Sequence, residues 1–229
     1  PLESWFAEQG WSPHDFQRDA WYAYGKGEEV LIQAPTGSGK TYAGLGAAIR
    51  EGVRRASSGD KAMGLQLIWI APIRALTKEI QYSAQRMVSG MGLDWEVGVR
   101  TGDTSSKEKA NQRKKMPQIL ITTPESLHVM LAMKGVEKRF GALRLMVVDE
   151  WHDLLGTKRG TQVELASAWF RRIAPNYRCW GISATVGNLD EALRVLVGPG
   201  RPGRLVRCEW VKRTEVRSLM PNRFERLPW

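Results

Sequence analysis

The sequence lacks a long hydrophobic run. Hydrophobic residues make up 42% of its 229 residues, yet no uninterrupted apolar stretch approaches the roughly eighteen residues that a membrane-spanning helix needs. The same 42%, together with 25% charged residues, is an ordinary globular composition and excludes a wholly disordered chain. We expect no membrane partner, and at about 150 residues per domain the length predicts one domain plus an appendage.

Cysteine and histidine are scarce. The two cysteines, Cys179 and Cys208, lack the Cys-x-x-Cys spacing of metal and redox sites, and the three histidines form no cluster. A domain of this size needs no disulfide, so we expect reduced thiols in a cytoplasmic protein. No signal peptide is visible. The chain begins at Pro1 rather than at a methionine, so we expect the natural N-terminus to be missing.

Acidic residues are fewer than basic ones. The chain has 34 Lys and Arg against 24 Asp and Glu, a net charge of +10. Such an excess favours a polyanionic partner, of which nucleic acid is the commonest. A solvated surface that keeps the protein soluble explains the same excess, so the charge alone leaves both interpretations open.

What the sequence does contain is an alternation of short apolar strands with amphipathic helices. Helices are predicted over 75–91, from Pro124 after a Thr123 cap, and over 189–197 after an Asn188 cap. The strands are apolar on both faces, as in a parallel sheet covered by helices. This order predicts an α/β domain with a mostly parallel twisted sheet and helices on both faces. The predicted strands are 30–33, 67–71, 97–100, 119–122, 145–149 and 179–183.

The character of the sequence changes after Gly198. Residues 199–203 read Pro-Gly-Arg-Pro-Gly, a turn-rich break, and a last short strand is predicted at 205–210. We therefore predict a nucleotide-binding domain at 1–200 and a basic strand and linker at 201–229.

A phosphate-binding loop is predicted at 34–41, Ala-Pro-Thr-Gly-Ser-Gly-Lys-Thr, between a strand and a small-residue helix at 42–50. Glycines let backbone amides approach phosphate oxygens, and the start of the helix adds free amides and a positive dipole end. Lys40 would bind the β- and γ-phosphates, and the Thr41 hydroxyl would ligate Mg²⁺. The usual pattern begins with glycine where this loop has Ala34, and the alternative is a glycine-rich turn with a chance Lys-Thr. The predicted nucleotide-binding residues in the loop are Thr36, Gly37, Ser38, Gly39, Lys40 and Thr41.

Two adjacent acids end the apolar strand at 145–149. Ligands of doubly wound sheets bind at the carboxyl ends of strands, so Asp149 and Glu150 are expected near the phosphate loop. Asp149 would reach the metal through its water shell, and Glu150 would orient or deprotonate the attacking water. His152 would hydrogen-bond to the next strand end. With Lys40 these are the candidate catalytic residues; the alternative is a strand that leaves into solvent with ordinary surface acids.

The motifs, in this order, resemble those of superfamily 2 helicases of the DExH-box type, in their first RecA-like domain. Phe16-Gln17 lies where these enzymes carry an adenine-reading glutamine. Trp151 and Lys158-Arg159-Gly160 are most similar to the large helicase-related (Lhr-like) group, particularly the bacterial ligase-associated helicases. The matching segments are 34–41 for motif I, 72–76 for Ia, 123–126 for Ib, 149–152 for II and 183–185 for III.

The resemblance implies an ATP-dependent motor on single-stranded nucleic acid, with DNA favoured over RNA and a role in repair. It implies that Gln17 contacts adenine and that Ser183 and Thr185 couple hydrolysis to domain movement. A second RecA-like domain in cis would supply arginine fingers, and repair nucleases or ligases would be partners. Because no further strand–helix alternation follows motif III, we expect a fragment that hydrolyses ATP weakly. The implied nucleic-acid path comprises Pro72, Arg74, Thr101, Gly102, Thr123, Pro124, Glu125 and Arg159.

Other functions stay open. A GTPase is disfavoured because the guanine motif Asn-Lys-x-Asp is absent from the sequence, and a small-molecule kinase is disfavoured because no lid or acceptor pocket is recognisable in it. A nucleic-acid-binding module without catalysis would explain the charge alone, and an RNA helicase would share the same motifs. The basic segment 107–115 is most simply a solvated helix face, and Trp69 and Trp169 are expected in the core.

Overall fold

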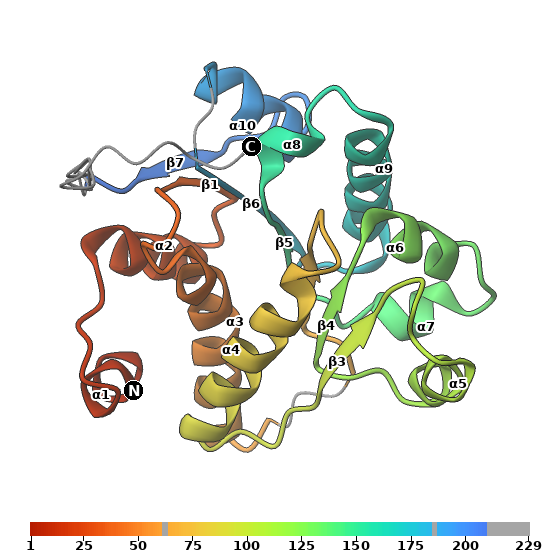
Figure 1. Cartoon of the computed structure of the whole chain (residues 1–229), viewed down its shortest axis with the longest axis horizontal. Helices are drawn as coiled ribbons and strands as arrows, with labels where there is room; N and C mark the ends of the chain where they lie inside the picture. The colour runs from red at the N-terminus through yellow and green to blue at the C-terminus, as the bar shows by residue number, and fades with distance from the viewer. Residues whose placement is uncertain (61–63, 185–186, 210–229) are drawn as a thin grey trace, which may run out of the picture.

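A computed structural model describes residues 1–60, 64–184 and 187–209. Its centre is a seven-stranded sheet in the order β3-β4-β2-β5-β6-β1-β7. Every neighbouring pair is parallel, so the carboxyl ends of all strands share one edge of the sheet (Figure 1). The predicted parallel α/β fold is confirmed. The strands are β1 (Val30–Gln33), β2 (Leu67–Ile70), β3 (Val97–Arg100), β4 (Ile119–Thr122), β5 (Leu145–Val148), β6 (Arg178–Ser183) and β7 (Arg204–Arg207).

Helices cover both faces of the sheet. Figure 1 shows α2, α3 and α4 on one side and α6, α9 and α10 on the other. None of the helices in the described residues is long and apolar enough to cross a membrane. The helices are α1 (Leu2–Glu8), α2 (Asp15–Lys26), α3 (Lys40–Ser57), α4 (Leu76–Gly90), α5 (Ser106–Lys114), α6 (Pro124–Leu131), α7 (Val136–Phe140), α8 (Trp151–Leu154), α9 (Lys158–Ile173) and α10 (Leu189–Val197).

The two helical layers enclose two hydrophobic clusters. Successive strand residues alternate between them: Ile32 packs with the α1–α4 side and Leu31 with the α6–α10 side. This is why the strands are apolar on both faces. Trp69 is fully buried in the first cluster, and Trp169 packs partly buried against the second, both in the core as predicted.

The helix after the phosphate loop is longer than predicted. It was expected over 42–50, but α3 runs from Lys40 to Ser57. Its glycines do not end it, because they sit under large rings: a Cβ at Gly44 would lie 2.8 Å from Trp69, and one at Gly46 would lie 2.6 Å from the Nε1 of Trp21. Close packing at these positions offsets the low helix propensity of glycine.

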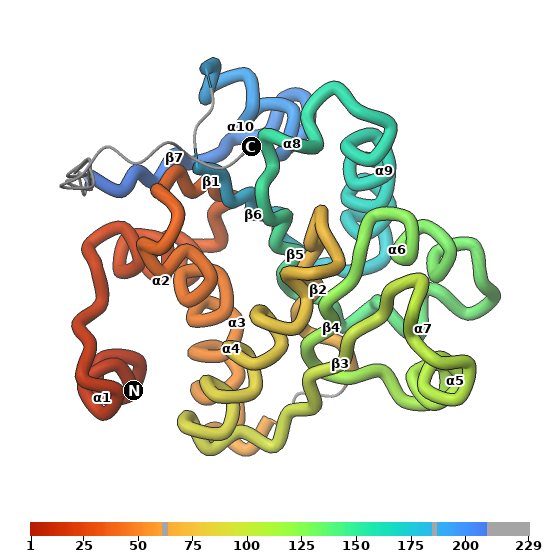
Figure 2. Tube along the Cα trace, viewed as in Figure 1, coloured from red at the N-terminus to blue at the C-terminus, as the bar shows by residue number. Residues whose placement is uncertain are grey.

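The last predicted strand joins the sheet. It was expected at 205–210 and is observed as Arg204–Arg207, paired with β1 so that Val30 lies opposite Arg204. Figure 2 shows β7, near the end of the described chain, beside β1 from near its start. The division at residue 200 stays a prediction, and residues 210–229 lie outside the described part of the chain.

Candidate nucleotide and nucleic-acid site

The loop after β1 has the backbone of an anion site. Gly37 and Gly39 have φ of 83°, in the left-handed region that favours glycine. Gly39 caps α3, which begins at Lys40. Ser38 is buried, and its hydroxyl donates to the Pro35 carbonyl at 2.7 Å, which holds the loop closed on itself. In the described structure the amides of Gly39, Lys40 and Thr41 have no protein acceptor, so the helix start presents free donors.

The structure brings Lys40 and the two acids together. The Lys40 Nζ atom lies 3.4 Å from the Oε1 atom of Glu150, although 110 residues separate them in sequence. β6 lies between β5 and β1 in the sheet, so the acids approach the loop across one intervening strand. The predicted meeting of the phosphate loop with the acidic strand end is therefore present in the structure.

Asp149 has a buried carboxyl that accepts hydrogen bonds from two donors. Its carboxyl accepts from the Trp69 Nε1 at 3.3 Å and from the Glu150 amide at 3.0 Å. Burial, together with the adjacent Glu150 carboxylate, raises the pKa of Asp149 to about 6; the two donors and Lys40 act in the opposite direction. Burial is the largest of these effects, so removal from water is the main reason that the Asp149 carboxyl holds its proton more tightly than a free aspartate.

Glu150 is strained. It has φ of 45° and is the non-glycine residue with positive φ among those described. Its Oε2 atom is buried and accepts no hydrogen bond from the described residues; the Nδ1 atom of His152 lies 3.5 Å away. A left-handed backbone at a non-glycine residue costs about 1–2 kcal/mol, and strain of this kind gathers at functional positions.

His152 links this strand end to the next. Its Nδ1 atom lies 2.9 Å from the Oγ atom of Ser183, which is fully buried at the end of β6. The predicted hydrogen bond between His152 and the neighbouring strand end is therefore present. Thr185, the second predicted coupling residue, lies outside the described residues.

Gln17 touches the phosphate loop from α2. Its Nε2 donates to the Gly39 carbonyl at 2.9 Å, and its Oε1 accepts from the His14 amide at 2.8 Å. The side chain is 1% exposed. These bonds tie the first turn of α2 to the cap of α3, so the glutamine is positioned beside the loop; its contact with adenine stays a prediction.

The residues present fit a magnesium nucleotide. Glycine bends, free amides and Lys40 suit phosphate oxygens, and the buried Asp149 with the half-exposed Thr41 offers oxygen ligands. The described residues contain no group of three or more His, Cys, Asp or Glu that could cage a metal ion. Mg²⁺ needs no such cage, because it keeps waters and is bound by one or two protein oxygens plus substrate phosphates.

The predicted nucleic-acid residues lie along the same edge, beyond β5. Arg74, after β2, donates to both carboxylate oxygens of Asp103, at 2.9 and 3.0 Å. A Cβ at Gly102 would lie 2.9 Å from the Arg74 Nη2, so the loops after β2 and β3 meet there. Gly102 and Arg74 are exposed.

Arg159 joins two further loops. Its Nε donates to Glu125 at 2.6 Å and its Nη2 donates to the Pro72 carbonyl at 2.7 Å. The beginning of α9 is thereby tied to the loop after β2 and to the beginning of α6. All eight predicted positions follow β2, β3 or β4 or, for Arg159, contact these loops.

The hydroxyls of two predicted residues are used inside the protein. Thr123 is 4% exposed and accepts from the Ser126 amide as the cap of α6. Thr101 is 6% exposed, and its hydroxyl accepts from the Asp103 amide at 3.3 Å. Both hydroxyls are therefore already bonded within the protein.

Sequence reasoning missed two partners in the site. Trp69 was assigned to the core alone, but its indole also donates to Asp149, and Asp103 was not singled out as the acid that pairs with Arg74. β2 neighbours β5 with Trp69 opposite Val147, a pairing that no local pattern encodes.

The family profile described as DEAD/DEAH box helicase matches residues 14–192. The chain belongs to the DEAD/DEAH box helicase family. This helicase domain is 34% identical to ATP-dependent helicase Lhr-Core protein 2 of Thermococcus barophilus, covering 95% of the chain and 27% of that relative. It is 31% identical to Lhr helicase/uracil glycosylase of Escherichia coli, covering 95% of the chain and 15% of that protein. The chain thus spans about a quarter or less of these relatives.

Solved structures agree with the family. The structure of Mycobacterium smegmatis helicase Lhr bound to ssDNA and AMP-PNP matches with a TM-score of 0.82 and 31% identity, over 91% of the helicase domain and 27% of that chain. DEAD-box helicase Mss116 bound to ssRNA and UDP-BeF matches with a TM-score of 0.74 and 20% identity, over 86% of this chain and 40% of that one, which shows the fold alone. The resemblance to Lhr-like helicases and the RecA-like fold are confirmed.

Proposed function

We propose that this helicase domain binds Mg-ATP at the carboxyl edge of its sheet and acts as the first motor domain of a translocase on single-stranded DNA. The ion pair between Lys40 and Glu150 carries the proposal. It joins the phosphate loop to the acid that would act on water, which is the arrangement that nucleotide hydrolysis requires.

The chemistry follows from the contacts of each residue. Lys40 would exchange the Glu150 carboxylate for the β- and γ-phosphate oxygens, which bear more negative charge. Thr41 and Asp149 would hold Mg²⁺, which supplies positive charge against the phosphate oxygens. Glu150, released from Lys40, would orient the attacking water and accept its proton. His152 is bonded to Ser183 at the end of β6, the strand between β5 and β1. Through this bond a movement of the acidic strand end would be passed on to β6.

DNA is proposed over RNA because the M. smegmatis Lhr, at 31% identity, is described with ssDNA. The loop backbones, Arg74 and Arg159 would contact phosphates, which position a strand without reading its sequence. A role in repair, membership of the ligase-associated branch, nuclease or ligase partners and a cytoplasmic location stay predictions.

Hydrolysis by the chain alone is proposed to be weak. An arginine finger contributes about 10³–10⁵ in turnover, and we propose that a second RecA-like domain in cis supplies it. Robust DNA-stimulated ATPase activity from the 229-residue chain would contradict this part of the proposal.

Calorimetric titration of Mg-ATP into the chain tests the nucleotide site. The parent chain and a Lys138→Ala control, changed at an exposed lysine of α7, should bind alike, whereas Lys40→Ala should abolish detectable binding. No affinity in the parent chain would overturn the proposal. Preference for GTP over ATP would instead favour another class of P-loop enzyme.

A second titration tests the strand. Fluorescence anisotropy with a labelled oligothymidylate and a labelled oligouridylate of equal length compares the affinity of the parent chain for single-stranded DNA and for single-stranded RNA. Tighter binding of the DNA is expected. Tighter binding of the RNA would favour an RNA helicase, and strand binding that is indifferent to Mg-AMP-PNP would favour a binding module without a motor.

A further inference from the structure

A second basic cluster lies at the opposite edge of the sheet from the nucleotide site. Arg144 directly precedes β5, Arg178 begins β6, and Arg50 and Arg54 belong to the second half of α3. Since α3 starts at Lys40 and rises 1.5 Å per residue, Arg54 lies about 21 Å along the helix from the phosphate loop. The four arginines line a cavity of about 290 Å³ together with Trp21, Tyr24, Gly25, Ala47 and Glu51.

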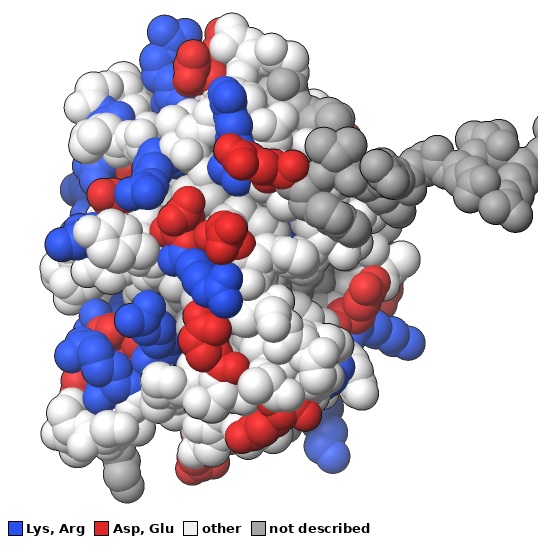
Figure 3. Space-filling model, turned by 90° about the vertical axis from the view of Figure 1, so that its left-hand side faces the viewer, with Lys and Arg blue, Asp and Glu red and all other residues white. Residues whose placement is uncertain are grey.

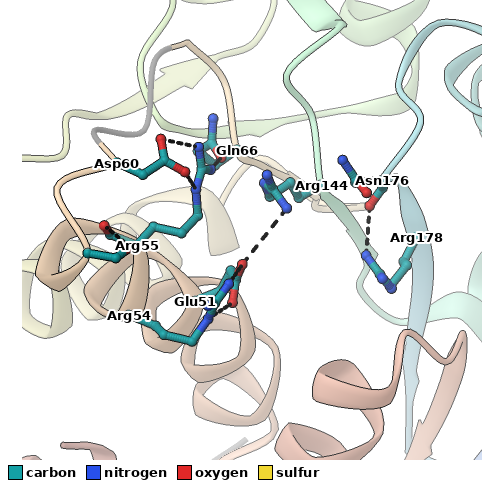
Figure 4. Close-up of polar contacts among 9 residues, drawn as sticks. Glu51, Arg54, Arg55, Asp60, Gln66, Arg144, Asn176 and Arg178 are labelled. Atoms are coloured by element: carbon teal, nitrogen blue, oxygen red, sulfur yellow. Dashed lines mark hydrogen bonds and ion pairs between the residues drawn. The ribbon is translucent and has the colours of Figure 1, made fainter.

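The acid in this cavity neutralises only part of its charge. Glu51 is the carboxylate among the described lining residues, and both of its oxygens accept from Arg54, at 2.9 and 2.8 Å. The Arg144 Nη1 lies 3.8 Å from Glu51, which is too far for a hydrogen bond. Figure 4 shows Arg54 against Glu51, with Arg144 reaching toward the same carboxylate from the other side.

Arg178 and Arg50 add positive charge to the cavity that Glu51 does not neutralise. Arg178 lies over the ring of Tyr24 and donates to the Asn176 carbonyl at 2.7 Å, but its buried Nε has no acceptor among the described residues. Arg50 is exposed at the mouth. In the described part of the chain neither Arg50 nor Arg178 forms an ion pair, so the positive charges of both remain without a carboxylate partner.

The neighbouring cavity shows the contrast. It has about 320 Å³ and is also lined by Arg144, but its other guanidinium, Arg55, is saturated. Arg55 donates to both oxygens of Asp60, at 2.7 and 3.1 Å, and to Gln66 at 2.9 Å (Figure 4). Of these two cavities, only the first is lined by Arg50 and Arg178, the arginines that form no ion pair with the described residues. Figure 3 shows basic and acidic side chains interspersed over the face that forms the left-hand side of Figure 1.

The shape suits a small oxyanion. Gly25 sits in the wall, and nothing lies within 4 Å of the position that its Cβ would take, so the helix leaves open space. The volume corresponds to about ten water molecules at ~30 Å³ each. Guanidinium forks bind phosphate oxygens in pairs, and a phosphate monoester carries about −1.5 to −2 charges at neutral pH. Arg50 and Arg178, which lack an ion pair in the described part of the chain, and Arg144, which shares Glu51 with Arg54, leave positive charge that a phosphate group would balance.

We propose that this cavity, lined by Arg50, Arg144 and Arg178, is a second anion site that binds a phosphate group, either of a small phosphate or of a nucleic-acid backbone. It lies apart from the nucleotide site and does not depend on the proposed function. A strand held there would pass the amino-terminal edge of the sheet, while the predicted path of the motor follows the carboxyl edge.

The arginine Nε–Hε signals in NMR spectra of the whole chain report on this cavity directly. Inorganic phosphate should shift the Arg144 and Arg178 signals saturably, with Mg-ADP present to occupy the other site. The variant Arg50→Gln/Arg144→Gln should weaken binding at least tenfold, and Arg172→Gln, at an exposed arginine of α9, should leave it unchanged. Arg50→Gln alone changes a residue that makes no hydrogen bond or ion pair with the described residues, so it covers the case that the double variant unfolds.

Comparing different anions shows where the bound phosphate group comes from. If an oligothymidylate shifts the same signals at lower concentration than phosphate, the ligand is a nucleic-acid backbone; if phosphate acts and the oligonucleotide does not, it is a small phosphate. Saturable shifts by a glutamate decapeptide but not by phosphate would overturn the assignment. So would unsaturable shifts with every anion, or equal affinity in the parent and Arg50→Gln chains.

Discussion

The Nδ1 atom of His152 lies 2.9 Å from the Oγ atom of Ser183. The contact joins the ends of β5 and β6, and β6 pairs with both β5 and β1. It therefore connects the acidic strand end to the strand beside the phosphate loop. A change in the position of Glu150 on nucleotide binding would reach Ser183 through a side chain two residues away.

Ser183→Ala should weaken the coupling between nucleotide and strand without abolishing nucleotide binding. A side-chain hydrogen bond contributes about 0.5–1.5 kcal/mol, a factor of about 2–10. We expect the change in ssDNA affinity caused by Mg-AMP-PNP, measured by anisotropy, to shrink by this factor, and His152→Ala/Ser183→Ala to add little more. Ser89→Ala, at an exposed serine of α4, is the control; equal coupling in all variants would contradict the role.

The left-handed backbone at Glu150 should lower the stability of the protein, while its carboxylate is needed for hydrolysis. Its φ of 45° suits glycine better than any other residue. The free energy of unfolding of Glu150→Gly should therefore exceed that of Glu150→Ala by about 1–2 kcal/mol. Both variants lose the carboxylate, so neither should hydrolyse Mg-ATP. Urea unfolding of the two variants measures the difference directly. Equal stability would mean that the backbone relaxes without the glutamate and that the strain is not built into the loop.

The stability of the nucleotide-free chain should fall as the pH rises through the titration of Asp149. The folded pKa of about 6 lies above the ordinary aspartate value of 3.8, so the folded chain binds more protons in this window and this contribution to stability is lost between about pH 4 and pH 6. Asp149→Asn removes the titration. Between about pH 4 and pH 6 the free energy of unfolding of the parent should therefore fall by about 1–3 kcal/mol relative to that of the variant, since each unit of pKa corresponds to about 1.4 kcal/mol.

Urea unfolding in EDTA at several pH values measures this difference, and comparison with the variant cancels the other carboxyls. Hydrogen bonds that asparagine cannot reproduce shift the variant by a constant amount and leave the pH dependence unaffected. A parent and a variant with parallel pH profiles would show that Asp149 has an ordinary pKa in the folded chain.

Arg159→Gln should weaken strand binding. The guanidinium ties the loops after β2 and β4 together through Pro72 and Glu125, and its 37% exposed side chain can still meet a phosphate. Loss of one phosphate contact should lower the slope of log affinity against log salt by about 1. Anisotropy at several salt concentrations checks this, with Arg172→Gln as the control. An unchanged slope would show that Arg159 holds the loops together but does not contact a phosphate.

Local patterns predicted much of this protein. Strand positions agreed to within a residue or two at most ends, because short apolar runs between turn residues are local signals. The phosphate loop was predictable because its glycines, Lys40 and Thr41 are adjacent in sequence. The extent of α3 was not, because the rings of Trp21 and Trp69 that pack on its glycines come from other elements.

The sequence by itself determined which groups exist to bind phosphate, metal and water, since these lie in contiguous motifs whose backbone conformation is local. Only the tertiary structure decided their partners. The strand order brings Glu150 to Lys40, Trp69 to Asp149 and Arg159 to Pro72, and it gathers Arg144 and Arg178 with two arginines of α3 around one carboxylate, Glu51. The physical reason is that charge balance and burial depend on neighbours in space, which a parallel sheet draws from distant parts of the chain.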